Sequence, residues 1–257
     1  MNRRNSTAAL VSAKSFGVSI GVQCPPEHAD SVLAQFPAGW AAIDGAALDC
    51  TIVLQQDEQG LFRVRRKSTY ITPPQHLDSA ISSLQNEILI VIAEYAKSHV
   101  FVHSGVVSWH GRLVLIPGTS FAGKSTLVWS LVQAGGLYFS DEFAVFDASG
   151  HVQPFPLPIS LRSDDGGKRH EMPENVASTP ALPDLVIFAN YREGKQWEPE
   201  RLRPAQTAMN LLRHSVGVKR NPDLVLSVLK GVGLRAEGFA GYRGHWSQVL
   251  DWLGART

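Results

Sequence analysis

The chain has 257 residues and a net charge of +1, with 24 basic and 23 acidic side chains. It therefore lacks the basic field that a nucleic-acid-binding protein uses, and we expect no nucleic-acid partner. No apolar stretch approaches the ~18 residues of a membrane span, and the first apolar run is too short for a signal peptide, so we expect no membrane partner and a cytoplasmic location.

Residues 1–74 predict a small α+β unit. Short runs of alternating apolar and polar residues between 15 and 72, separated by Pro and Gly, indicate strands around one helix near 27–36. After this unit, apolar residues recur at three- and four-residue steps, which predicts an amphipathic connecting helix over 75–97. The apolar face of that helix comprises Leu77, Ile81, Leu84, Ile88, Val91, Ile92 and Tyr95.

Residues 98–257 predict an α/β domain. Two apolar runs, HVFVHSGVVSW and RLVLIPG, flank His110-Gly111 and predict two strands joined by a tight turn. A helical pattern runs from Lys124 to Gln133, and the apolar run LYFS follows it as a strand. The remaining predicted elements are a hairpin over 143–161, a polar loop over 163–183, a strand over 184–191, helices near 204–216 and 222–231, a strand over 234–242 and a helix over 245–254.

The second strand of the pair runs into a glycine-rich segment with the spacing of a phosphate-binding loop. Glycines let backbone N–H groups approach phosphate oxygens, and the helix that follows directs its positive N-terminus at the anion. A lysine at the end of such a loop reaches the β- and γ-phosphates, and the next hydroxyl is a natural Mg²⁺ ligand. We therefore predict a nucleotide-binding segment made of Gly118, Thr119, Ser120, Phe121, Ala122, Gly123, Lys124, Ser125 and Thr126.

Two carboxylates, Asp141 and Glu142, end the next predicted strand. We expect this strand to lie parallel to and beside the strand that precedes the loop, which would bring Asp141 to the phosphates at the carboxyl edge of the sheet. There Asp141 can take a proton from an acceptor hydroxyl, or hold Mg²⁺ together with Ser125 and Glu142. The alternative is that these carboxylates only cap the segment that follows them.

Basic side chains lie on or beside the predicted polar loop, at Arg162, Lys168 and Arg169. Phosphoryl transfer spreads negative charge over the γ-oxygens, which an arginine or lysine can stabilise. Arg162 is the strongest of the three candidates because it ends the preceding strand. The alternative is a solvated surface loop, in which charged residues are common.

Several classes of nucleotide-binding protein fit this sequence less well. A GTPase shows an Asn-Lys-x-Asp element and a transporter-type ATPase a Leu-Ser-Gly-Gly signature, and neither occurs here. Small-metabolite kinases of the shikimate type do place an aspartate at this distance after the lysine, and they remain an alternative. A nucleotide-sensing adaptor that no longer transfers phosphate is a second alternative.

The segment HSGVVSWHGRLVLIPGTSFAGKSTL, followed by GGLYFSDE, resembles the catalytic C-terminal domain of the HPr serine kinase family. The resemblance covers roughly residues 99–162. It implies a P-loop kinase fold shared with phosphoenolpyruvate carboxykinases, and an ATP- and Mg²⁺-dependent kinase acting on a serine of a peptide or protein. Family members often form hexamers, which implies a homo-oligomer.

The resemblance also implies a role for each matching residue. Lys124 matches the phosphate-binding lysine and Ser125 the metal-binding hydroxyl. Asp141 matches the aspartate that activates the serine, and His103 the histidine that assists it. Glu142 stands where the family usually has a second aspartate.

The chain departs from full HPr kinases in one downstream signature. The family pattern Glu-x-Arg-Gly is replaced by Ser160-Leu161-Arg162-Ser163, which argues against HPr as the substrate and against the reverse phosphorylase activity. The chain looks more like the shorter kinases encoded with ribosomal-peptide maturation enzymes, such as those for lasso peptides. That branch implies a precursor peptide as the substrate.

Overall fold

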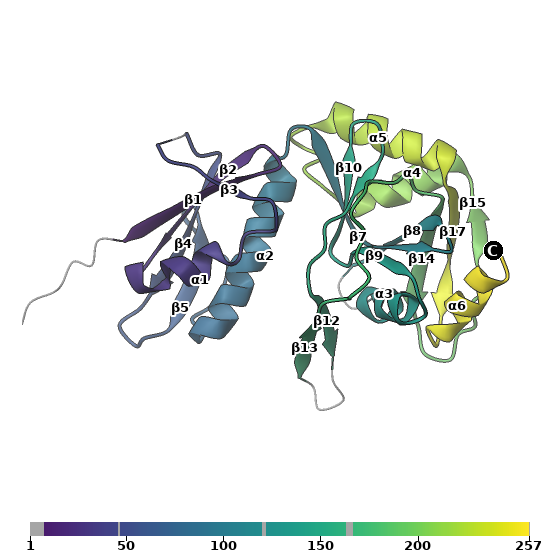
Figure 1. Cartoon of the computed structure of the whole chain (residues 1–257), viewed down its shortest axis with the longest axis horizontal. Helices are drawn as coiled ribbons and strands as arrows, with labels where there is room; N and C mark the ends of the chain where they lie inside the picture. Colours follow the sequence, from purple (N-terminus) through teal and green to yellow (C-terminus); the bar gives the residue numbers. More distant parts are fainter. Residues whose placement is uncertain (1–7, 46, 120–121, 163–166, 257) are drawn as a thin grey trace, which may run out of the picture. The chain divides into compact units, whose positions relative to one another are not determined.

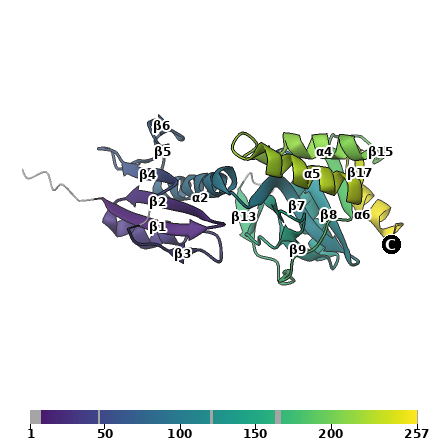
Figure 2. The same ribbon diagram turned by 90° about the horizontal axis from the view of Figure 1, so that it is seen from above.

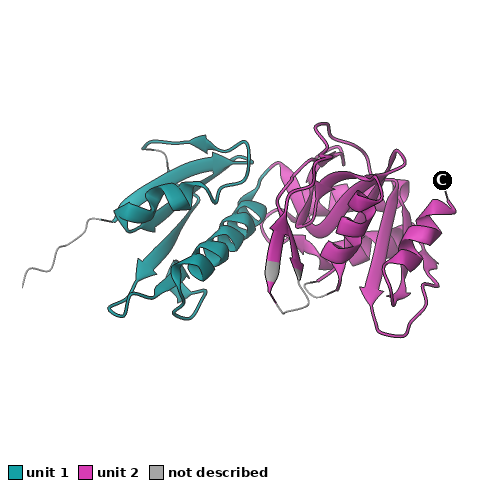
Figure 3. Cartoon of the chain, turned by 60° about the horizontal axis from the view of Figure 1, so that its bottom comes forward, with its two compact units in different colours: residues 1–97 teal, residues 98–257 magenta. Residues whose placement is uncertain are grey.

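The computed structural model describes residues 8–45, 47–119, 122–162 and 167–256. The described chain is a mixed α/β protein with two main mixed sheets and the helices α1 to α6 (Figure 1). It divides into two compact units, unit 1 over residues 1–97 and unit 2 over residues 98–257 (Figure 3). Within the described residues, no helix is long and apolar enough to cross a membrane.

Unit 1 is built on a six-stranded sheet in the order β3-β1-β2-β4-β5-β6. Strands β2 and β4 pair in parallel, and the other neighbours pair antiparallel. Its elements are β1 (Ala9–Ser15), β2 (Val18–Cys24), the 3-10 helix η1 (Pro26–His28), α1 (Ala29–Leu33), β3 (Ala41–Ala42), β4 (Cys50–Gln56), β5 (Phe62–Arg66), β6 (Thr69–Tyr70) and α2 (Leu77–Tyr95).

The predicted amphipathic helix over 75–97 is confirmed as α2. Its face containing Leu84, Ile88 and Ile92 is fully buried, and α2 packs against β2, β4 and β5. Each such side chain contributes roughly 1.5–3 kcal/mol when removed from water, so this face holds the helix on the sheet. The helix predicted near 27–36 is shorter than expected, because only η1 and α1 are helical there.

Unit 2 contains the longer sheet, in the order β11-β10-β7-β8-β14-β17-β15, with β9 and β16 also paired to β7. Strands β8, β14 and β17 are parallel neighbours. The elements are β7 (His99–Trp109), β8 (Arg112–Pro117), α3 (Lys124–Gln133), β9 (Leu137–Ser140), β10 (Phe143–Asp147), β11 (Val152–Gln153), β12 (Ile159–Arg162), β13 (Lys168–Glu171), β14 (Leu185–Tyr191), β15 (Glu200–Leu202), α4 (Pro204–Arg213), β16 (Ser215–Val216), α5 (Pro222–Arg235), β17 (Glu237–Arg243) and α6 (Ser247–Gly254).

The two faces of the unit 2 sheet are covered by different helices. Alternate residues of β8 enter two separate cores, because successive side chains of a strand point to opposite faces. Leu113 and Leu115 pack in the core that includes residues of α4 and α5, whereas Val114 and Ile116 pack in the core that includes residues of α3 and α6. Helices α4 and α5 lie side by side over their face (Figure 2).

The predicted tight turn between β7 and β8 is confirmed. His110 and Gly111 have φ angles of 47° and 79°, as a two-residue hairpin turn with left-handed residues requires. The turn sets the register that places Ser104 of β7 opposite Pro117 of β8. The last residues of β8, just before the glycine-rich segment, therefore lie beside the middle of β7.

Two sequence predictions for unit 2 are wrong. The predicted polar loop over 163–183 contains β13, which pairs antiparallel with β12. Strand β13 has the sequence KRHE, in which apolar and polar residues do not alternate, so the sequence pattern does not predict a strand there. The strand LYFS (β9) is not a neighbour of β8: it pairs antiparallel with β7, on the edge of β7 opposite to β8.

Candidate functional site

The glycine-rich segment lies between the end of β8 and the start of α3. The Gly118 N–H donates to the carbonyl of His103 at 3.4 Å, which anchors the segment to β7. A Cβ on Gly118 would lie 3.2 Å from the Ala122 Cβ and 3.3 Å from the Lys124 Cγ, so the loop folds tightly on itself. Lys124 Nζ donates to the Thr119 carbonyl at 3.2 Å. Ser120 and Phe121, also predicted to bind nucleotide, lie outside the described residues.

Gly123 is the N-cap of α3 and has a φ of 77°, in the left-handed region that favours glycine. The predicted helix over Lys124–Gln133 is confirmed as α3. No side chain caps its N-terminus among the described residues, and its first turn holds no acidic residue. The first N–H groups of a helix have no intrahelical partner, so this end of α3 suits an anion.

Asp141 and Glu142 form a break between β9 and β10, two strands that both run antiparallel to β7. The buried hydroxyl of Ser140 accepts from the N–H groups of Glu142 (3.3 Å) and Phe143 (3.2 Å), which holds the break in place. On the other side of the break, the Ser104 N–H donates to the Glu142 carbonyl at 3.3 Å. The carboxylate pair is therefore fixed to the middle of β7.

The backbone of β7 joins the two parts of the site. The His103 carbonyl accepts from the N–H of Gly118, and the N–H of its neighbour Ser104 donates to the backbone carbonyl of Glu142. The expectation that Asp141 would reach the loop through a parallel β8–β9 pairing is therefore corrected. Asp141 reaches it across β7, where Gly105 has no side chain and a Cβ would lie 3.7 Å from Asp141 Oδ1.

Asp141 is a buried carboxylate, with 8% of its surface exposed. Its Oδ1 has no hydrogen-bond partner among the described residues. Burial raises the pKa of Asp141 to about 7, against the opposing effects of a hydrogen bond from Ser125 and the charge of Lys124. The structure thus brings Asp141 together with Lys124 and Ser125, as the sequence led us to expect.

His103 lies beside Glu142, with 3.7 Å between Nδ1 and Oε1. Burial, aided by the charge of Lys124, lowers the pKa of His103 to about 4. The imidazole is therefore neutral at neutral pH, and this contact is not an ion pair there. The ring also packs on Phe143 of the paired strand β10, with ring centroids 4.4 Å apart.

Lys124 supplies a positive charge to the site. Burial lowers its pKa, and the charges of Glu142 and Asp141 oppose that shift. Burial also raises the pKa of Glu142, while Lys124 lowers it. A half-buried lysine between two carboxylates and an uncapped helix N-terminus can balance the charge of a phosphate.

The residues present are suited to Mg²⁺ held jointly with a nucleotide. In the described parts of the chain, no three His, Cys, Asp or Glu side chains cluster into a metal site made by protein alone. Mg²⁺ in phosphoryl-transfer sites usually takes only one or two protein ligands and completes its shell with phosphate and water. The buried Asp141 Oδ1 without a partner, beside the Ser125 hydroxyl, offers that type of oxygen ligand.

The structure places the backbone of Arg162, the third predicted catalytic residue, at the end of β12. It lies opposite Lys168 in the β12–β13 pairing, and the side chains of these two residues are outside the described part. Arg169 lies on β13, with its Nε 3.7 Å from Glu171 Oε1. Of the three, only the Arg169 side chain is described, and its ion pair is with Glu171 rather than Asp141.

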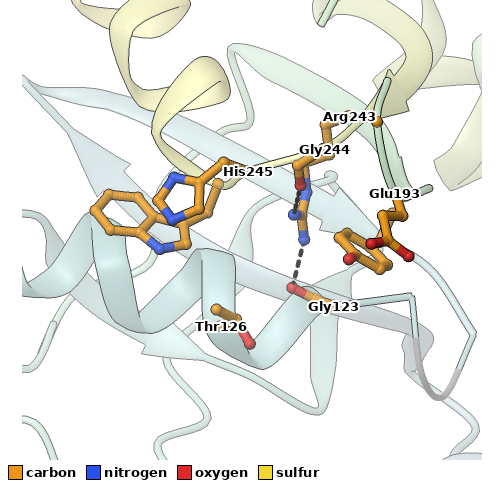
Figure 4. Close-up of a pocket in the computed structure, with 9 residues that line it drawn as sticks. Gly123, Thr126, Glu193, Arg243, Gly244 and His245 are labelled. Atoms are coloured by element: carbon orange, nitrogen blue, oxygen red, sulfur yellow. Dashed lines mark hydrogen bonds between the residues drawn. The ribbon is translucent and has the colours of Figure 1, made fainter. Parts of the chain in front are cut away.

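Arg243, which the sequence reasoning missed, contacts the loop directly. It ends β17, is only 3% exposed, and donates from Nη2 to the Gly123 carbonyl at 2.9 Å. Figure 4 shows its side chain reaching Gly123, with Thr126 on α3 close by. Its position at the carboxyl end of a parallel strand was the available signal, since ligand sites form at that edge.

Comparison with known proteins assigns the chain to no family. No protein-family model matches it, and no curated protein is significantly similar to it.

Proposed function

We propose that unit 2 is a P-loop kinase domain of the HPr kinase type, and that it transfers the γ-phosphoryl group of ATP to a serine hydroxyl of a peptide or protein. The observation that carries the proposal is the position of Asp141. Its buried carboxylate lies beside Ser125 and Lys124, at the start of the helix that follows the glycine-rich loop.

The arrangement of elements supports the same proposal. A strand (β8), a glycine-rich loop and a helix (α3) follow one another, and β8 continues into a parallel set with β14 and β17. Phosphate loops have this context, with the anion at the helix N-terminus and the carboxyl edge of the sheet. The loop amides and Lys124 would bind the β- and γ-phosphates.

Ser125, Asp141 and Glu142 would hold Mg²⁺. When bound, this ion neutralises charge that develops on the transferring phosphoryl group. A carboxylate has two oxygens, so Asp141 can serve the metal and still present an oxygen to the acceptor. A Cβ at Gly105 would clash with Val128 Cγ2, so glycine lets α3 pack closely on β7 beside Asp141.

The transfer step places the proton on Asp141. The serine oxygen forms its bond to the γ-phosphorus as the bond from that phosphorus to the β,γ-bridging oxygen breaks, and ADP leaves. Asp141 would accept the hydroxyl proton as a general base. The neutral imidazole of His103 would orient the acceptor and the neighbouring Glu142 carboxylate.

The proposal is tested by following the γ-phosphate. The purified chain is incubated with Mg²⁺, ATP labelled at the γ-phosphate, and the peptides and proteins encoded by neighbouring genes. We expect acid-stable label on serine, and none with Lys124→Ala. Label recovered in a small molecule instead would favour a metabolite kinase. Binding of ATP without any transfer would favour a nucleotide-sensing adaptor.

A further inference from the structure

A cavity of about 410 Å³ opens beside the phosphate loop of unit 2. Its size falls within the roughly 300–1,000 Å³ of small-molecule sites. The lining residues that matter here are Gly123, Thr126, Tyr191, Glu193, Arg243 and Trp246. They come from the start of α3 and from the carboxyl ends of β14 and β17, with the segments that follow these strands.

The topology connects the cavity to the loop. Tyr191 and Arg243 occupy paired positions on the parallel strands β14 and β17. Gly123 and Thr126 flank Lys124 and Ser125 on α3. If Lys124 binds one end of a phosphate chain, the opposite end of that chain would therefore lie beside this cavity.

One end of the cavity is formed by a buried positive charge. The Arg243 guanidinium donates to two neutral carbonyls, those of Gly123 and Gly244, at 2.9 and 3.2 Å. Its Nε is buried and has no hydrogen-bond partner among the described residues. The ion pairs found among those residues do not include Arg243. A buried cation of this kind is stabilised when an anion binds next to it.

The rest of the cavity is suited to a flat, partly polar group. Tyr191 is 53% exposed, and its ring lies 5.8 Å from the Arg243 guanidinium carbon. Trp246 is half-buried and packs on the α3–α6 core. Figure 4 shows His245 and Glu193 on opposite sides of Arg243, so an exposed carboxylate also borders the cavity.

We propose that this cavity binds the nucleoside part of the nucleotide, with Tyr191 and Trp246 contacting the base and Arg243 facing the phosphate next to the ribose. The inference rests on the proposed function, because it assumes that the loop holds the β- and γ-phosphates. Aromatic side chains bind bases of any sequence by stacking. The Glu193 carboxylate can accept from a ribose hydroxyl or from an amino group of the base.

The test compares ATP with inorganic tripolyphosphate, which carries the phosphates without the nucleoside. Calorimetric titration of the full chain should show ATP binding at least about tenfold more tightly than tripolyphosphate, the order expected from one base stack. Tyr191→Ala and Trp246→Ala should each weaken ATP binding about tenfold and leave tripolyphosphate binding unchanged.

Tyr242→Ala is the matched control. Tyr242 precedes Arg243 on β17 and is 48% exposed, close to the exposure of Tyr191, but it does not line the cavity. This variant should bind both ligands like the wild type.

Three outcomes would overturn an assignment. Equal affinity of the wild type for the two ligands would overturn the nucleoside cavity, and so would unchanged ATP affinity in both cavity variants. Failure of the wild type to bind either ligand would instead reject the phosphate loop, and with it the proposed function on which the cavity rests. Lys124→Ala should lose affinity for both ATP and tripolyphosphate. The cavity variants should lose affinity for ATP only, and this difference distinguishes the role of the loop from that of the cavity.

Discussion

Arg243 donates a hydrogen bond to the carbonyl oxygen of Gly123 across 120 residues of sequence. The bond joins the end of β17 to the N-cap of α3, where Gly123 has a φ of 77°. A Cβ on Gly123 would collide with the Arg243 guanidinium. The conformation of the glycine-rich loop therefore depends on both residues.

Gly123→Ala and Arg243→Ala should each weaken ATP binding, because each disturbs this one contact. The double variant should be no weaker than the more affected single variant, with a coupling of about 0.5–3 kcal/mol between the two sites. Calorimetric titration of the four proteins measures that coupling.

Gly150 also has a positive φ, of 87°, but nothing lies within 4 Å of its Cβ position. Gly150→Ala should therefore show no coupling to Arg243→Ala, and strictly additive losses for Gly123 and Arg243 would contradict the account.

Asp141→Asn should stabilise the chain relative to the wild type as pH rises. The native pKa of Asp141 is about 7, raised from an ordinary value of 3.8. Between these two values the native state holds a proton that the unfolded state has lost, so wild-type stability falls as pH rises from about 4 to 7. The amide has no such dependence, and the difference should reach the order of 1–4 kcal/mol. Urea unfolding of both proteins at pH 5 and pH 8 measures this difference in unfolding free energy. Identical pH profiles for the two proteins would show that burial does not raise the pKa of Asp141.

Part of the candidate site in unit 2 and part of the fold of unit 1 were predictable from sequence, because their main signals are local. The spacing of Gly118, Gly123 and Lys124 and the 3.6-residue period of α2 are each contained in a short segment, and the structure has the predicted helices there. The pairing of β9 is different, since LYFS can pair in parallel or antiparallel and only the rest of the sheet decides. Arg243 belongs to no sequence motif, so its contact with the glycine-rich loop, far away in sequence, could not be predicted from a local pattern.

His103→Gln should flatten the acid side of the stability profile. The native pKa of His103 is about 4, below its ordinary value of 6.5. As pH falls from about 6.5 to about 4, the unfolded state takes up a proton that the native state refuses, so the wild type loses stability in this window. Glutamine cannot titrate, and the variant should lose less. Unfolding curves at several pH values between 7 and 4 measure the loss of stability in each protein. Equal losses in both proteins would show that burial does not lower the pKa of His103.

The central claim is that Asp141 takes the proton during transfer to a serine, and the most direct measurement is the mass of the acceptor after a single turnover with ATP and Mg²⁺. We predict a gain of roughly 80 Da on one serine with the wild type. Asp141→Asn should still bind ATP but transfer at least about a hundredfold more slowly. Transfer by Asp141→Asn at the wild-type rate would contradict the mechanism, and ATP binding without mass gain on any serine-containing candidate would contradict the peptide-kinase assignment.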